Sequence, residues 1–177
     1  SVLGVPRNIT SAVRALLTGE RRTFDLGRLP DGRYFTFAAG VGVDVAMVQR
    51  TSIGEKRYLG MVSYAMTATR AAFRGDMINI TVDVDGKPVK ARVVLAMVAN
   101  AGSILGGRFA LGPNVKPDDG ELDLCLYMPQ HPREVFAVFW KLLRRDFSPD
   151  PLMQFVRGRT FRLESESPVP VQADGDI

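Results

Sequence analysis

The chain has 177 residues, 46% of them hydrophobic and 24% charged, and a formal net charge of +4. This composition predicts a globular chain with one well-filled core, and apolar stretches such as VVLAMVA at 93–99 are far shorter than the roughly 20 residues that a membrane span needs. The basic residues are spread along the chain without interleaved aromatic residues, so nucleic acid is not an expected partner.

The first predicted elements are a short amphipathic helix and a β-hairpin. Asn8 or Thr10 can cap the helix, and Gly19 ends it. The segments 21–29 and 33–40 are predicted strands, because the Pro-Asp-Gly between them supplies the fixed and positive φ angles of a tight reversal.

A second hairpin follows two helical patterns. Its strands, at 77–84 and 89–100, flank Asp85-Gly86, a dipeptide that favours the primed turns whose twist matches paired strands. Apolar residues at helical spacing predict the two preceding helices at 45–51 and 58–73.

The second half of the chain predicts a long loop, a helix and three more strands. The loop covers 101–117, the helix begins at Pro132, and the strands lie at 121–128, 158–165 and 169–175. Strands outnumber helices and arrive mainly as hairpins. We therefore expect an α+β fold, with a mainly antiparallel β-sheet system that helices flank at one side or end.

Carboxylates gather at one loop-to-strand junction, where Asp118, Asp119, Glu121 and Asp123 lie within six positions. Such a segment is either an ordinary solvated turn or a place where carboxylate and backbone oxygens surround a hard cation. The residues taken alone favour the turn.

Indications of other kinds of site, such as a catalytic triad or a phosphate-binding loop, are weak. His131, the one histidine, stands beside a helix start, where a capping or surface role is expected, and it leaves a serine or cysteine triad without a base. Cys125 is the single cysteine and is expected to be a buried thiol in a strand, which excludes an intrachain disulfide and favours a reducing compartment. The glycine-rich segment 102–107 lacks a P-loop lysine and is expected to be a turn.

Three longer segments resemble one family in sequence and in order. They are RYFTFAAGVGVDVAMV at 33–48, VVLAMVANAGSILGGRFALGPNVKPDDGELDLCLY at 93–127 and VQADGD at 171–176. All three are similar to the C-terminal half of the bacterial diacylglycerol kinase-like lipid kinases. The resemblance covers residues 1–177, with 1–20 similar to the helical region that connects that family's two domains. Nothing matches the family's Gly-Gly-Asp-Gly-Thr nucleotide loop. The resemblance therefore implies a sandwich-like C-terminal domain that lacks the N-terminal nucleotide-binding domain.

The resemblance also implies a metal site and a base. The carboxylate of Asp119, with the backbone carbonyls of Lys116 and Glu121, would hold a structural Mg²⁺, while Asp118 and Asp123 would lie outside the coordination sphere or in solvent. Asp176 stands where the family has a glutamate that serves as the proposed base. The residues alone favour a simple Asp-Gly-Asp turn at this position.

Two further groups of residues follow from the same resemblance. Asn100, Gly106 and Gly107 match a segment that faces the family's interdomain cleft, where they would position nucleotide or lipid headgroup; taken alone they indicate a strand end and a loop. Five residues could line an acyl-chain pocket or could simply belong to the core: Phe35, Phe37, Met61, Met66 and Phe73.

The function implied is the lipid-accepting half of an ATP-dependent lipid kinase for diacylglycerol or a related lipid alcohol. A non-catalytic lipid-binding or regulatory module is the alternative, and a sphingosine-type kinase is a more distant one. The implied partners are a lipid substrate, Mg²⁺, ATP bound mainly by the N-terminal nucleotide-binding domain, an anionic membrane surface that meets the helix at 132–145, and a second copy in a homodimer. With no secretory leader in view, we expect a cytoplasmic, peripherally membrane-associated protein. The chain alone is expected to be inactive.

Overall fold

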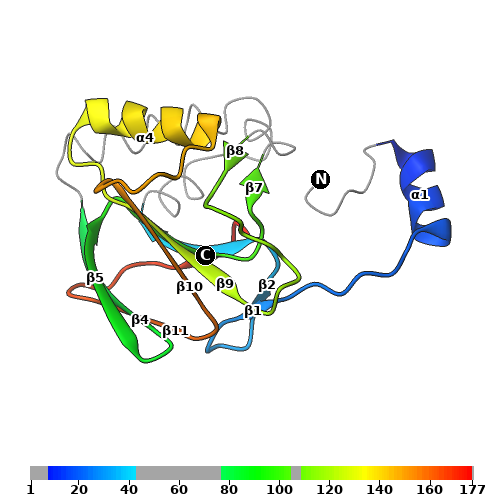
Figure 1. The fold of residues 1–177 in the computed structure, drawn as a ribbon. Coiled ribbons are helices and arrows are strands. Elements are labelled where there is room, and N and C mark those ends of the chain that lie inside the picture. The colour runs from blue at the N-terminus through cyan, green and yellow to red at the C-terminus, as the bar shows by residue number, and fades with distance from the viewer. Residues whose placement is uncertain (1–7, 43–76, 105–108, 177) are drawn as a thin grey trace.

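A five-stranded and a three-stranded antiparallel sheet form the body of the protein in a computed structural model, which describes residues 8–42, 77–104 and 109–176 (Figure 1). The five-stranded sheet has the order β10 (Met153–Gly158), β9 (Leu122–Tyr127), β6 (Leu95–Ala99), β3 (Ala38–Gly42) and β12 (Gln172–Ala173). The three-stranded sheet has the order β11 (Phe161–Ser165), β4 (Ile78–Val84) and β5 (Lys87–Val93). The helices expected at 45–51 and 58–73 lie outside the described residues.

Apolar side chains from both sheets meet between them and make the fold a sandwich. One core cluster joins Val82 and Val93 of the small sheet to Leu124 and Leu126 of β9. The other face of the five-stranded sheet carries a second cluster, in which Cys125 and Tyr127 pack with Val138 of helix α4 (Pro132–Arg144). The expected α+β, mainly antiparallel, sandwich-like fold is confirmed.

Both predicted hairpins form. Asp85 and Gly86 have φ angles of 51° and 84°, as a primed turn requires, and they join β4 to β5. The first hairpin is shorter than expected, because β1 (Gly27–Arg28) and β2 (Tyr34–Phe35) contribute two residues each.

The strand predicted at 89–100 is in fact two strands in different sheets. The chain leaves the small sheet after Val93 and enters the large one at Leu95, and the Val94 N–H donates to the Tyr127 carbonyl at this corner. Gly42 lies against the corner with a φ of 102°, and a Cβ there would collide with the Val94 carbonyl oxygen. A continuous run of strand-forming residues does not reveal such a change of sheet.

One other prediction needs correction, and one strand was missed. The segment 101–117 is not one continuous loop, since β7 (Ser103–Ile104) and β8 (Phe109–Ala110) pair within it. Strand β10 was not predicted, although it lies at the edge of the five-stranded sheet beside β9.

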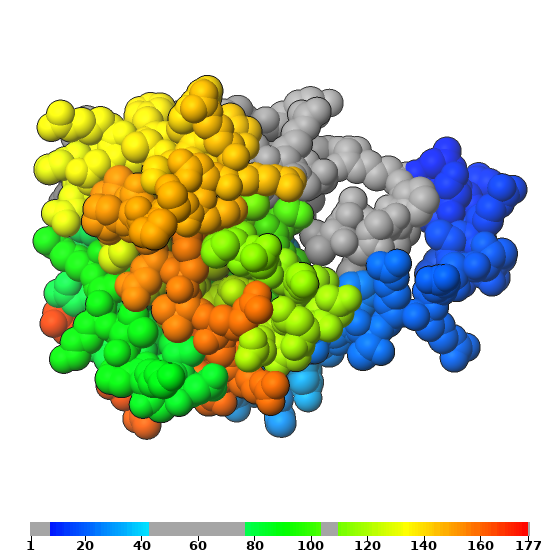
Figure 2. Space-filling view, in the orientation of Figure 1, coloured from blue at the N-terminus to red at the C-terminus, as the bar shows by residue number. Residues whose placement is uncertain are grey.

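The two described helices begin where expected. Asn8, rather than Thr10, caps α1 (Ile9–Thr18) by accepting from the Ser11 N–H at 3.2 Å, and Gly19 follows its last turn. His131 occupies the N-cap of α4, as expected. Helix α1 buries no residue and lies apart from the sheets, whereas α4 lies along the body (Figures 1 and 2). In the described part of the chain, no helix is long and apolar enough to cross a membrane.

Candidate functional site

The carboxylates of the loop-to-strand junction gather around one arginine. The Arg157 guanidinium lies 3.6 Å from Asp119, 3.7 Å from Glu121 and 3.5 Å from Asp123, and it donates to the Asn114 carbonyl at 2.9 Å. We call residues 114–123 the carboxylate loop. No sequence pattern pointed to Arg157 as a site residue, because it lies on β10, the strand that was not predicted.

Asp123 is buried, so of its two expected places the one in solvent is wrong, and the one outside a metal's coordination sphere stays a prediction. The residue is only 4% exposed, and its Oδ2 has no hydrogen-bond partner among the described residues. Burial raises the pKa of Asp123, while the Arg157 charge opposes that rise. The burial of Asp123 agrees with that of strand β9, which is buried at every position after Leu122.

Asp25 fastens the carboxylate loop to the start of the first hairpin. Its N–H donates to the Pro117 carbonyl at 2.7 Å, and its Oδ2 accepts from the Gly120 N–H at 2.7 Å. Gly120 has a φ of 77°, which favours glycine. Asp25 belongs to no motif, so only the fold could identify it.

Asn100 joins three segments of the chain and is 1% exposed. Its amide nitrogen donates to the Asp25 carbonyl at 2.6 Å and to the Thr36 carbonyl at 3.0 Å, and its backbone N–H donates to the Phe37 carbonyl at 2.8 Å. Its Oδ1 is buried without a partner among the described residues. The cleft role predicted for Asn100 stays a prediction, and Gly106 and Gly107 lie outside the described residues.

The C-terminal Asp-Gly-Asp forms a tight turn. Asp174 and Gly175 have φ angles of 50° and 95°, and the backbones of Ala173 and Asp176 exchange hydrogen bonds of 2.8 and 2.9 Å across it. The Asp176 residue is exposed. The turn expected from the residues is present, and the role of Asp176 as a base stays a prediction.

Asp174 fastens this turn to the chain after the first hairpin. Its carboxylate accepts from the Thr36 N–H at 2.7 Å, the Thr36 hydroxyl at 2.8 Å, the Phe37 N–H at 2.8 Å and the Ala38 N–H at 3.1 Å. Partial burial acts to raise the pKa of Asp174, but these donors together outweigh it and hold the pKa below its usual value.

These contacts form one polar network from the C-terminal turn to the carboxylate loop. Asp174 holds the backbone at Thr36, Asn100 holds both Thr36 and Asp25, and Asp25 holds Gly120. The structure therefore places two sites that the sequence treats separately, the loop with Asp119 and the turn with Asp176, on one hydrogen-bonded framework.

The oxygen atoms that the carboxylate loop could offer as ligands suit Mg²⁺ chemically. One carboxylate and two backbone carbonyls are hard oxygen ligands, and Mg²⁺ commonly keeps water in its remaining positions. The space beside Gly120 is open, since nothing lies within 4 Å of a Cβ placed there. Among the described residues, however, no three acidic, histidine or cysteine side chains converge on a point, so an ion would depend on the Lys116 and Glu121 carbonyls as well as on Asp119.

The residues proposed for an acyl-chain pocket are only partly described. Phe35 is 3% exposed and packs with Ala39 and Ala173, and Phe37 packs against the core cluster beneath α4. Met61, Met66 and Phe73 lie outside the described residues. Their lipid-pocket role stays a prediction.

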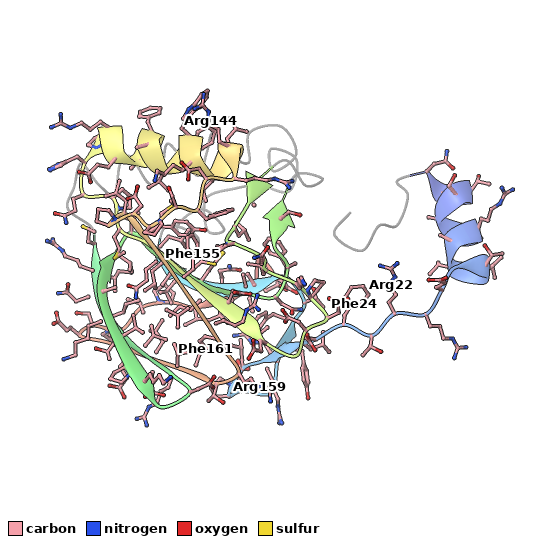
Figure 3. The ribbon with its side chains drawn as sticks, viewed as in Figure 1. Arg22, Phe24, Arg144, Phe155, Arg159 and Phe161 are labelled. Carbon is pink, nitrogen blue, oxygen red and sulfur yellow. The ribbon has the colours of Figure 1, made fainter. Side chains whose placement is uncertain are left out.

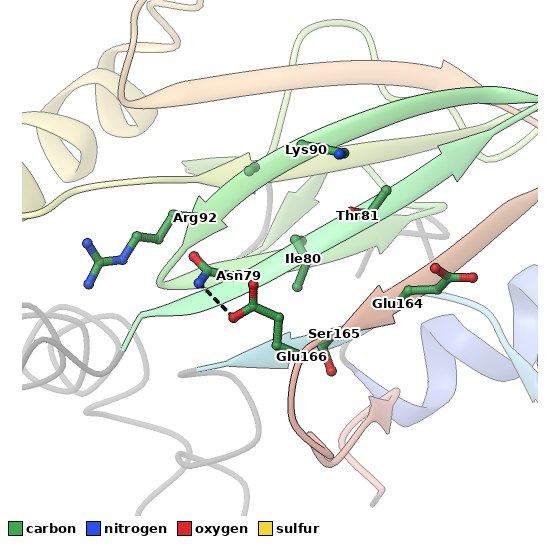
Figure 4. Close-up of a pocket in the computed structure, with 9 residues that line it drawn as sticks. Asn79, Ile80, Thr81, Lys90, Arg92, Glu164, Ser165 and Glu166 are labelled. Atoms are coloured by element: carbon green, nitrogen blue, oxygen red, sulfur yellow. Dashed lines mark hydrogen bonds between the residues drawn. The ribbon is translucent and has the colours of Figure 1, made fainter.

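A surface hollow of about 550 Å³ lies elsewhere, on the three-stranded sheet (Figure 4). Lys90 and Arg92 line it together with Glu164 and Glu166, and Glu166 accepts a hydrogen bond from Asn79. Its mixed charges and wide opening do not select a ligand, and none of the predicted site residues lines it. We assign it no function.

The outward face of α4 exposes large apolar side chains. Phe136 is 62% exposed and Trp140 is 51% exposed, and the Arg144 guanidinium lies 4.7 Å from the centre of the Trp140 ring. Figure 3 shows Arg144 on the outer side of the helix, while Phe155 lies below it. Lys141 Nζ forms an ion pair with Asp150 Oδ2 at 2.6 Å. The helix therefore has one packed face and one apolar face with a basic edge.

Comparison with known proteins places this chain in a family. The family model of the YegS C-terminal NAD kinase beta sandwich-like domain matches residues 38–177. A candidate lipid kinase of Staphylococcus haemolyticus is 24% identical over 176 residues, which are 99% of this chain and 56% of that protein. A diacylglycerol kinase of Staphylococcus saprophyticus is 20% identical over 174 residues, which are 98% of this chain and 56% of that protein.

The fold comparison agrees. A solved structure of a candidate diacylglycerol kinase from Bacillus anthracis str. Sterne matches with a TM-score of 0.79 at 25% identity, covering 99% of this chain and 57% of that one. The chain spans about half the length of the curated relatives it matches. The resemblance found in the sequence is thus confirmed: this chain belongs to the family of the YegS C-terminal NAD kinase beta sandwich-like domain.

Proposed function

We propose that this chain is the lipid-accepting half of an ATP-dependent lipid kinase that phosphorylates diacylglycerol or a related lipid alcohol. The observation that carries the proposal is the polar network, because it fixes the Asp176 turn and the carboxylate loop to one framework. The names of the relatives support the same class of reaction. ATP would be held mainly by a second, nucleotide-binding domain.

In this proposal Asp176 removes the proton from the lipid hydroxyl. The hydroxyl oxygen forms a bond to the γ-phosphorus of ATP as the bond to ADP breaks, and the carboxylate carries the proton away. Asp176 is suited to this step because it is exposed and lies on a turn whose backbone is closed by two hydrogen bonds. Asp174, with its four donors, serves instead to hold the turn.

The carboxylate loop would hold Mg²⁺ through Asp119 and the carbonyls of Lys116 and Glu121. When bound, the ion would supply positive charge and order to the cleft between the two domains. The chain's own contribution is to present these oxygens, which it does by tying the loop to Asp25 and Arg157.

The direct test is a comparison of the 177-residue chain with a two-domain protein that joins it to a nucleotide-binding domain. Transfer of phosphate from labelled ATP to diacylglycerol is expected only with the two-domain protein, because phosphoryl transfer depends on holding the nucleotide in line with the hydroxyl. Lipid binding by the chain without phosphorylation by either protein would instead favour the non-catalytic module. Sphingosine as a second acceptor would separate the two lipid classes.

We also propose that the outward face of α4 contacts an anionic membrane surface, from which a lipid substrate must be taken. Phe136 and Trp140 supply apolar area, and Arg144 supplies charge at the same face. Binding to vesicles with anionic lipid should exceed binding to neutral vesicles at low salt, as measured by co-sedimentation.

The double substitution F136S/W140S should weaken vesicle binding at least about 10-fold, because each side chain would lose apolar burial worth roughly 2 kcal/mol. Leu163→Ser is a matched control, since this exposed apolar residue lies on β11 in the three-stranded sheet. Equal binding to both kinds of vesicle, or equal weakening by the control, would show that α4 is only a packing helix.

A further inference from the structure

The position of Arg157 is fixed by the sheet. Arg157 of β10 lies directly opposite Asp123 of β9 in the antiparallel register, so the two side chains share one face. Its guanidinium then reaches past Asp123 to Glu121 and Asp119, and it donates to the Asn114 carbonyl. A strand residue therefore supplies a fixed positive charge to the carboxylate loop.

The positive charge of Arg157 is shared among three carboxylates. Its distances to the three carboxylates, 3.5 to 3.7 Å, all exceed the usual 2.7–2.9 Å of a strong charged hydrogen bond. The guanidinium is thus centred among the three carboxylates instead of being committed to one of them. One positive charge among three carboxylates leaves the cluster negative overall.

We propose that Arg157 is a built-in counter-cation that sets how strongly the carboxylate loop binds Mg²⁺. Without the ion, the guanidinium offsets the repulsion among the carboxylates and keeps the loop in shape. With the ion on Asp119, the same fixed charge repels it, because two cations then compete for one carboxylate in a partly buried setting. Arg157 stabilises the loop and at the same time limits its affinity for the metal.

This inference rests on the proposed Mg²⁺ site, but it does not need kinase activity. The measurement is the Mg²⁺ dissociation constant of the 177-residue chain by calorimetry, together with the unfolding temperature with and without Mg²⁺. Mg²⁺ binding by the 177-residue chain, together with no phosphorylation by the two-domain protein, would count against the proposed function and leave the inference intact. The two failures are therefore distinguishable.

Arg157→Gln removes the charge, whereas Arg157→Lys keeps it and loses the planar fork. We expect Arg157→Gln to lower the unfolding temperature without Mg²⁺ and yet to bind Mg²⁺ about 10-fold more tightly, a size typical of coupling between two sites. Arg157→Lys should bind Mg²⁺ within about 3-fold of the unaltered chain, because its charge remains. A purely structural arginine would give weaker binding in both variants.

Two controls test the site itself. Asp119→Ala should abolish the binding, whereas Asp118→Ala, which removes one charge from the neighbouring position, should leave most of it. If Asp118→Ala and Asp119→Ala weaken binding equally, or if the unaltered chain binds no Mg²⁺, the proposal is wrong. Unchanged or weaker binding by Arg157→Gln also overturns it.

Arg157→Gln leaves the buried Asp123 without its counter-charge and could prevent folding. Asp123→Asn nearly conserves the shape of the side chain and removes the buried negative charge that needs a counter-charge. The effect of Arg157 can therefore be measured in this background. The double variant R157Q/D123N should bind Mg²⁺ more tightly than Asp123→Asn alone. Equal binding by these two variants would contradict the proposal even if the single Arg157→Gln variant never folded.

Discussion

Asp176→Asn in the two-domain protein should lower the turnover of lipid phosphorylation by about 10²- to 10⁴-fold, the usual loss when a general base is removed. The asparagine side chain is close in shape to aspartate but cannot accept the hydroxyl proton. Because Asp176 is exposed and contributes its backbone to the turn, the stability of the chain should change by no more than about 0.5 kcal/mol.

Asp176→Glu is the matched control, because it restores the residue type of the family pattern. It should retain turnover within about 10-fold of the unaltered protein, since a base remains and only its reach changes. Steady-state rates with diacylglycerol, combined with thermal unfolding, separate chemistry from folding. If Asp176→Asn keeps full turnover, the turn has no part in proton transfer.

Asp174→Asn, two residues away in the same turn, should destabilise the fold, whereas Asp176→Asn should lower turnover and leave stability nearly unchanged. The carboxylate accepts from three backbone N–H groups and one hydroxyl. An amide in its place has only one oxygen that can accept, and its NH₂ group would face N–H and O–H groups that are themselves donors. We expect a loss of about 2 kcal/mol, or roughly 4–8 °C in unfolding temperature. Asparagine is the informative replacement because it tolerates the φ of 50° at this position.

The effect of Asp174→Asn should also depend on pH. The pKa of Asp174 is lowered in the folded state, so its ionised form stabilises the fold above the unfolded carboxyl pKa of about 3.9, and this contribution is lost as the pH falls through the lower folded value. Denaturant unfolding at pH 7 and pH 3 should show a large difference between the two proteins at pH 7 and a smaller one at pH 3. A difference that stays constant would mean that the carboxylate charge plays no role.

The sequence alone predicted several features that depend on neighbours along the chain. Asp85-Gly86 predicted a primed turn, and Asn8 or Thr10 predicted the helix start at which Asn8 is the cap, because φ preferences and capping bonds act within a few residues. The order of similar segments also identified the family, since it reads directly from the letters.

Tertiary structure decided the features that depend on distant parts of the chain. Asp123 belongs to the acidic segment that reads as a solvated turn, yet it is only 4% exposed, with Arg157 of the neighbouring strand beside it. The sequence determined that carboxylates gather ahead of a strand, but only the pairing of β10 with β9 places Arg157 among them, and only the folded hairpin brings Asp25 to the same loop. Such pairings between residues far apart in sequence follow from the packing of whole sheets, which no local pattern encodes.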